Sequence, residues 1–196
     1  MIDTPARWLR SAALITALVT LASCGGDKPT TPTPTGTSET TTATTTPPPS
    51  PEELAGEAAM TTLTELVRVE DMADQDPAGR DWEPDIRQYA GDPYAAVSVQ
   101  SVREYATYGI HQIGDSTVEA EVTAVDLTAP GGPTVLLTAC FDGSQSDVVR
   151  VDTGESILPP GEPTRFVWNV TVVQSELKPE APWLVTVKET HPDQPC

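Results

Sequence analysis

Apolar side chains recur at three- and four-residue intervals in the stretch that follows Ser50. The stripe comprises Leu54, Ala58, Ala59, Thr62, Leu63, Leu66 and Val69. This spacing places its members on one face of a helix. Ser50 and Glu53 have the spacing of a capping box, and Pro51 suits the first helical turn. The pattern therefore predicts an amphipathic helix that begins at Ser50.

Two further helices are predicted before the periodicity changes. The first is short and carries Trp82, Ile86 and Tyr89 on one face. The second opens at Asp92-Pro93, which suits a cap and a first turn. Its expected inner face comprises Tyr94, Val97 or Ser98, Val102 and Tyr105.

After Tyr105 the period changes from 3.6 residues to two. Val118, Ala120, Val122 and Ala124 alternate with Glu119, Glu121 and Thr123, which predicts a strand with one solvated face. Residues 133–141, 147–151, 164–174 and 183–189 read as further strands, separated by Gly- or Pro-containing turns. Short turns favour an antiparallel meander. Helices followed by such a meander predict an α+β domain with the helices on one face of the sheet.

The segment "TACFDGSQSDVVRVDTGE", followed by an Arg-containing strand and a last strand with "WLV", carries a family resemblance. This order is similar to the nuclear transport factor two-like, or SnoaL-like, fold of secreted and lipid-anchored actinobacterial proteins. The resemblance covers roughly Pro51 to Cys196 and implies helices packed on a curved, cone-like antiparallel sheet of the SnoaL/cystatin-like kind. Members include isomerases, dehydratases, cyclases and non-catalytic domains, so the fold does not fix the function.

The N-terminal segment has the features of an export signal. Arg7 and Arg10 precede an apolar run from Ser11 to Ala22, which is shorter than the ~20 residues that span a bilayer. Leu21-Ala22-Ser23-Cys24 resembles the bacterial lipobox. The resemblance implies a lipoprotein signal peptide at 1–23, a diacylglycerol on Cys24, and a place on the extracytoplasmic face of the cell membrane. A secreted protein with unmodified Cys24 and a retained membrane helix are the alternatives.

Residues 24–50 are expected to form a tether. Between Asp27 and Ser50 there are 11 Thr and 6 Pro, and no apolar side chain is larger than that of Ala43. Such a composition cannot form a core, so the sequence predicts a disordered, extended spacer. The tract resembles O-mannosylated linkers of actinobacterial lipoproteins, an unmodified spacer being the alternative. Residues 51–196 are then a single α+β domain.

The charge of the chain limits its partners. The sequence has 29 acidic and 11 basic residues, hence a net charge of −18. Nucleic-acid binding depends on Lys and Arg contacts to phosphate, so this class of function is excluded. A solvated acidic surface is the simplest interpretation of the excess.

Two cysteines are left once Cys24 is assigned to lipid. In an exported chain, Cys140 and Cys196 are expected to form a disulfide. Two Cys with distant His do not match zinc spacing. Asp74, Asp76, Gly79 and Asp85 are candidates for a calcium loop, because they occupy positions 1, 3, 6 and 12 of an EF-hand-like register. Ala78 replaces a ligand there, so a charged loop between helices is preferred and no metal is predicted.

No residue is assigned a catalytic role from the sequence. The resemblance implies that His and Asp in the cone cavity act as acid and base, which makes His111 a candidate, with Asp115 or Asp126 as partner. A partly exposed strand histidine is the alternative, and His191 lies in the tail. Phosphate-binding glycine loops and G-x-S-x-G motifs are absent from the sequence, and no cofactor is predicted.

Seven aromatic residues are expected to form the core or to line the mouth of the cone, and the core is preferred. They are Trp82, Tyr89, Tyr94, Tyr105, Tyr108, Phe166 and Trp168. The leading hypothesis is a lipid-anchored, non-catalytic envelope module that binds a protein or a small apolar ligand. The alternatives are a SnoaL-like isomerase or dehydratase that uses His111, and a structural spacer. A polar-based cavity with His111 beside a carboxylate would favour the enzyme.

Overall fold

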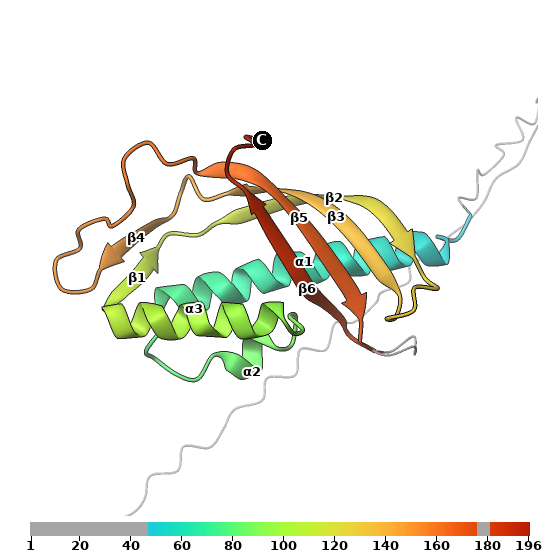
Figure 1. Cartoon of the computed structure of the whole chain (residues 1–196), viewed down its shortest axis with the longest axis horizontal. Helices are drawn as coiled ribbons and strands as arrows, with labels where there is room; N and C mark the ends of the chain where they lie inside the picture. Colours follow the sequence, from blue (N-terminus) through green and yellow to red (C-terminus); the bar gives the residue numbers. More distant parts are fainter. Residues whose placement is uncertain (1–46, 176–180) are drawn as a thin grey trace, which may run out of the picture. The chain divides into compact units, whose positions relative to one another are not determined.

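The computed structural model describes residues 47–175 and 181–196, which belong to a unit running from Thr46 to Cys196. Within them, three helices are followed by six strands (Figure 1). The predicted α+β order is therefore confirmed. The predicted signal peptide, Cys24 and the tether as far as residue 46 lie outside the described residues.

The first helix, α1 (Pro51–Gln75), begins as the sequence predicts. Ser50 Oγ accepts a hydrogen bond from the Glu53 N–H at 3.2 Å, and Glu53 Oε2 accepts one from the Ser50 N–H at 2.6 Å. Most of the predicted apolar stripe is buried, including Leu63 and Leu66. Leu54 is an exception, because 51 % of it is exposed in the first turn.

The other helices are α2 (Glu83–Ile86) and α3 (Tyr94–Tyr108). Ser98 and Val102 of α3 are buried, whereas Val97 is exposed, so the inner face passes through Ser98. Gly109 ends α3 in the left-handed conformation with φ 63°, which glycine adopts without a Cβ clash.

The larger sheet is antiparallel and contains β2 (Thr117–Asp126), β3 (Thr134–Asp142), β5 (Arg165–Gln174) and β6 (Trp183–His191), in that order. A second sheet pairs β1 (Ile110–Ile113) with β4 (Asp147–Arg150). The expected simple meander is therefore wrong at one strand, since β4 does not lie between β3 and β5 (Figure 1).

The small sheet continues the β2–β3 pair beyond a bend. The bend is formed by residues 114–116 on one side and 143–146 on the other, where the backbone leaves the strand conformation. Gly114 has φ 72°, and a Cβ at this position would collide with the Gln145 carbonyl oxygen. The close crossing thus requires glycine, and it directs β1 and β4 away from the larger sheet.

A β-bulge changes which residues of β2 face inward. The register shifts between Val122 and Ala124. Val122 still faces α1, where a Cβ on Gly56 would lie 3.0 Å from Val122 Cγ2. Ala124 pairs with the exposed Leu136, and Val125 packs against the core instead. The predicted alternation therefore holds to Val122 and fails after it, as a bulge inserts one extra residue.

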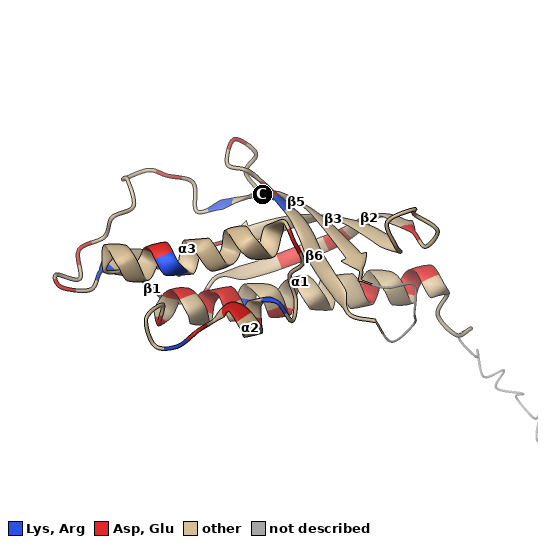
Figure 2. Ribbon diagram, turned by 60° about the horizontal axis from the view of Figure 1, so that its bottom comes forward, with Lys and Arg blue, Asp and Glu red and all other residues tan. Residues whose placement is uncertain are grey.

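Both α1 and α3 pack on one face of the larger sheet (Figure 1). The largest fully buried side chains come from both layers: Leu63, Leu66, Ile86, Val135, Leu137, Val170, Val172 and Val185. In Figure 2 acidic positions recur on α1 and α2, while basic ones are few. Among the helices of the described ranges, none has the length and apolar run that a bilayer crossing takes.

Candidate functional site

A cavity of about 600 Å³ lies between α1, the bent strands and the connection from β4 to β5. Its α1 side carries Val67, Glu70, Asp71 and Asp74, which share one helical face because they are three or four residues apart. Most residues of 158–164, in the β4–β5 connection, line it as well. The cavity is thus built where the bend separates the two sheets.

Glu70 and Lys188 form an ion pair in the cavity wall. Lys188 Nζ lies 2.9 Å from Glu70 Oε2, and the two side chains are only 14 % and 15 % exposed. Glu70 Oε1 accepts hydrogen bonds from Tyr94 Oη at 2.6 Å and Ser98 Oγ at 2.7 Å. Burial, followed by the nearby Glu70 charge, raises the pKa of Tyr94, so its hydroxyl stays a donor. The Glu70 carboxylate is therefore fully engaged.

Asp71 connects α1 to the bend. Gln112 Nε2 donates to Asp71 Oδ1 at 2.7 Å, and Ser116 donates through its Oγ to Oδ1 and through its N–H to Oδ2, at 2.7 and 2.8 Å. Asp71 and Gln112 are both buried. Because three neutral donors satisfy this carboxylate, Asp71 fixes the bend against the helix.

Asp74 differs from its two neighbours because no residue of the described chain donates a hydrogen bond to it or forms an ion pair with it. Burial, followed by the charges of Glu70 and Asp71, raises the pKa of Asp74 to about 7, while the charge of Lys188 opposes this shift. Burial, followed by the Asp74 charge, raises the pKa of Tyr105 on α3 to about 12. Of the cavity carboxyl groups on α1, Asp74 is therefore the one that is free to engage a ligand.

The opposite wall is aromatic. Phe141 stacks on Trp168 with ring centroids 4.4 Å apart, and Phe166 lies 5.2 Å from Phe141. Lys188 Nζ lies 4.2 Å from the Trp168 ring centroid and 4.9 Å from that of Tyr94. The cavity thus combines an apolar aromatic surface on the strands with charged side chains on α1 and Lys188, which is the composition of a small-molecule site.

The structure divides the seven aromatic residues between core and cavity. Trp82 is buried in the core, and Tyr89 and Tyr94 pack against it. Tyr105, Phe166 and Trp168 line the cavity. Trp168 also belongs to the core. Tyr108 is 68 % exposed. The preferred core placement is therefore confirmed for Trp82 and Trp168 and for Tyr89, Tyr94 and Phe166, which pack against the core, but not for Tyr105 and Tyr108.

The sequence patterns did not predict Glu70, Lys188 and Phe141 as cavity residues. Glu70 continues the inward stripe of α1 one turn after Leu66, and this charged position on an apolar face was the available signal. Lys188 pairs in register with the buried Val170. That register depends on a bulge between Thr171 and Val172, which the sequence pattern does not reveal.

His111 lies outside this cavity. It is on β1, opposite Val149 in register, while its neighbour Gln112 faces the cavity. His111 Nδ1 is buried and has no hydrogen-bond partner in the described chain. Asp115 accepts a hydrogen bond from Gln75, and Asp126 accepts from Thr128. The candidate pairing of His111 with either carboxylate in the cavity is not found among the described residues.

The other candidate residues are also separated. His191 ends β6, and its Nε2 lies 3.0 Å from Asn169 Nδ2. Asp85 pairs with Arg80 at 2.7 Å, Asp76 follows the last turn of α1, and Asp74 faces the cavity. Asp74, Asp76 and Asp85 therefore do not converge as the calcium register requires. Over residues 47–175 and 181–196, no group of three or more His, Cys, Asp or Glu side chains could hold a metal ion.

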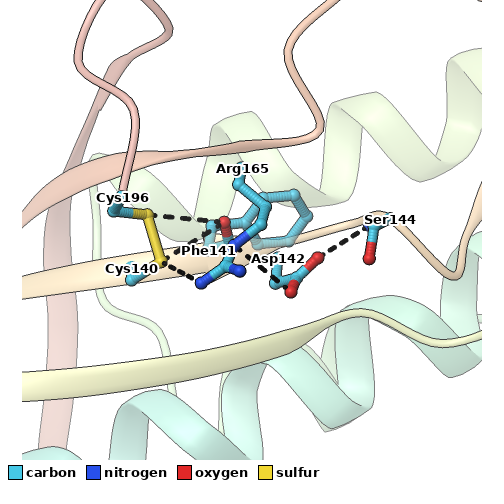
Figure 3. The surroundings of a disulfide bond; sticks show 6 residues. All are labelled: Cys140, Phe141, Asp142, Ser144, Arg165 and Cys196. Atoms are coloured by element: carbon cyan, nitrogen blue, oxygen red, sulfur yellow. Dashed lines mark hydrogen bonds and ion pairs between the residues drawn. A yellow bond between two sulfur atoms is a disulfide. The ribbon is translucent and has the colours of Figure 1, made fainter.

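The predicted disulfide between Cys140 and Cys196 is confirmed (Figure 3). It joins β3 to the last residue, with 5.7 Å between the two Cα atoms. Arg165 Nη2 donates to Cys140 Sγ at 3.7 Å, and Arg165 Nε lies 3.4 Å from Asp142 Oδ2. The bridge adjoins Phe141, so it fixes the strand that carries the aromatic wall of the cavity.

Comparisons with known proteins yield structural neighbours alone. No family model and no curated protein matches the chain. The intermembrane space region of the chloroplast protein ARC6 is 13 % identical, with a TM-score of 0.44, over 69 % of this chain and 95 % of that one. The VirB8 protein of Agrobacterium tumefaciens is 14 % identical, with a TM-score of 0.33, over 74 % and 96 %.

Proposed function

We propose that this chain is a lipid-anchored, extracytoplasmic module of the nuclear transport factor two-like class that binds a small amphipathic ligand. The proposal has two parts, a cellular location and a binding site. The location at the membrane is supported by the lipobox-like residues 21–24 and by the Thr- and Pro-rich stretch after them. The Cys140–Cys196 disulfide supports export, because disulfides persist in oxidising compartments.

The observation that carries the binding function is the cavity of about 600 Å³, with charged groups on α1 and aromatic rings on the strands. A site of this size suits a small organic molecule rather than a protein segment. A purely structural spacer needs no such cavity. The enzyme hypothesis relied on His111, which does not line it. Binding without catalysis is therefore the function that these residues support best.

The test uses the full chain with Cys24→Ser, which removes the predicted lipid site so that no detergent is needed. Nile red, a neutral apolar dye, is titrated into the protein and its emission is recorded. A saturable rise with one binding site is expected. Failure of the dye to bind would contradict the proposal.

A matched pair of variants locates the bound dye. Thr164 and Thr153 are both exposed threonines of the β4–β5 connection, but Thr164 alone lines the cavity. Thr164→Phe adds bulk at the cavity wall and is expected to weaken dye binding several-fold, whereas Thr153→Phe leaves it unchanged. Equal effects would place the dye elsewhere and would overturn the assignment to this cavity.

A further inference from the structure

The cavity has an uncompensated negative charge. Five acidic residues line it, Glu70, Asp71, Asp74, Asp147 and Glu162, and Lys188 is the one basic residue that does so in the described chain. Lys188 is already paired with Glu70. The donors to Asp71 are neutral groups of Gln112 and Ser116. The surplus charge inside the cavity is therefore not balanced by the protein.

Asp74 is the group at which this imbalance can be relieved. Its carboxyl faces the cavity from the last turns of α1, with Tyr105 across from it, and has no hydrogen-bond donor in the described chain. Half-buried carboxylates without a partner are unfavourable, because burial removes water without a replacement. A ligand cation would supply the missing donor and charge.

The aromatic wall supports the same type of ligand. Lys188 Nζ lies over the Trp168 ring, 4.2 Å from its centroid, so an aromatic ring of this wall already accommodates an ammonium group. Trp168 is only 5 % exposed and lines the same cavity. Phe141 and Phe166 extend the apolar surface of the cavity beyond the charged side chains of α1 and Lys188.

From this arrangement we infer that the ligand of the cavity is a cationic amphiphile, whose amine binds Asp74 while its apolar body packs on Phe141, Phe166 and Trp168. This inference rests on the proposed function, because it specifies the ligand class of the same site. An anionic ligand, such as a fatty acid, is disfavoured by the acidic lining.

Three probes with the same twelve-carbon chain test the inference: dodecylamine, dodecanol and laurate. Each probe is titrated into the complex of Nile red with the Cys24→Ser chain at physiological salt and pH 8. The probe is kept below the concentration at which it aggregates, and the displacement of the dye is measured. Dodecylamine is expected to displace the dye at about tenfold lower concentration than dodecanol, with laurate weakest. Butylamine, which keeps the amine but lacks a long apolar body, is expected to displace little dye.

Asp74→Asn keeps the size of the side chain and removes its charge. The advantage of dodecylamine over dodecanol should disappear in this variant, while dodecanol itself binds as before. Asp74→Ala is a second variant, in case the new amide forms bonds of its own. Glu57→Gln is the matched control, because it removes one charge from the same helix outside this cavity. It should preserve the preference for the amine.

The outcomes separate the inference from the proposed function. Equal displacement by amine and alcohol in the unsubstituted cavity would overturn the inference, while dye binding would still support a ligand site. An amine preference that survives in both Asp74 variants would also overturn it, because the long-range charge of the chain would then be the cause. Absence of dye binding would overturn both.

Discussion

Lys188 on the last strand lies 2.9 Å from Glu70 on the first helix, 118 positions earlier in the chain. The pair joins the two layers of the domain at the wall of the cavity. Tyr94 and Ser98 on α3 donate to the same carboxylate. Three elements therefore meet at Glu70, which lines the cavity together with Lys188.

Replacing Lys188 with Met should destabilise the domain strongly. The substitution leaves the buried Glu70 carboxylate without its cation, and the loss of one partner of a buried ion pair lowers the free energy of unfolding by about 3 kcal/mol. Urea denaturation measures the change. Arg103→Met is the control, since its ion pair with Glu83 is largely exposed and should contribute much less to stability. Equal losses in the two variants would contradict the structural role of the Glu70–Lys188 pair.

Asp74 should make the domain less stable as the pH rises from about 4 to about 7. Burial raises the pKa of Asp74 from 3.8 to about 7, so across this interval the folded protein holds a proton that the unfolded chain has lost. The free energy of unfolding therefore falls with increasing pH and levels off above pH 7. The charged groups facing Asp74 are Glu70 and Asp71 on the same helix and Lys188 on β6, and Tyr105 on α3 is the titratable group across from it.

Comparison of Asp74→Asn with the natural sequence isolates this effect. At pH 8 the variant should be more stable, and near pH 4 the difference should become small, as measured by urea denaturation at both pH values. Asp126→Asn provides a control of opposite sign, because hydrogen bonds from Thr128 lower the pKa of Asp126. Its carboxylate stabilises the fold at pH 8, and this contribution disappears as the pH falls. A pH-independent difference for Asp74→Asn would contradict the prediction.

The disulfide should contribute substantially to stability. It closes a loop with a sequence separation of 56 residues, for which the chain-entropy model gives about 4 kcal/mol. Cys196→Ser is expected to lower the urea midpoint, and the double variant with Cys140→Ser should be no less stable than this single variant. Intact mass should rise by two hydrogen atoms when reductant is added to the unsubstituted domain. No mass change would show that the bridge does not form.

Membrane attachment should depend on Cys24 alone among the three cysteines. Cys24→Ser removes the predicted acceptor of lipid, so the protein should move from the membrane fraction to the soluble exported fraction. Cell fractionation and immunoblotting provide the measurement. Cys196→Ser is the matched control and should remain with the membrane. If Cys24→Ser also stayed there, the lipid-anchor prediction would be wrong.

Local patterns account for the elements that were predicted correctly. The capping box at Ser50 and Glu53 begins α1, and the alternation from Val118 to Val122 marks an inward face of β2. Both depend on residues within a few positions of one another, where side-chain spacing and backbone geometry are directly related. The disulfide was also predictable, since only two cysteines remained to pair.

The errors occur where distant segments decide the outcome. The pairing of β4 with β1 requires the bend at Gly114 and Gln145, two segments that meet only in the folded domain. The bulges in β2 and between Thr171 and Val172 change which residues face the helices. A shift of one residue exchanges the two faces of a strand, so Lys188 was not recognised as an inward residue.

The sequence by itself determined the α+β order, the start of α1, the pairing of the last two cysteines and the absence of a recognisable catalytic motif. The tertiary structure alone decided that Glu70 meets Lys188, that Asp71 binds the bend, and that Asp74 is left without a partner in a cavity. The physical reason is that local periodicity reports which side chains avoid water. The partner of a buried charge depends instead on strand register and on the bend, both of which arise from contacts far apart in the chain.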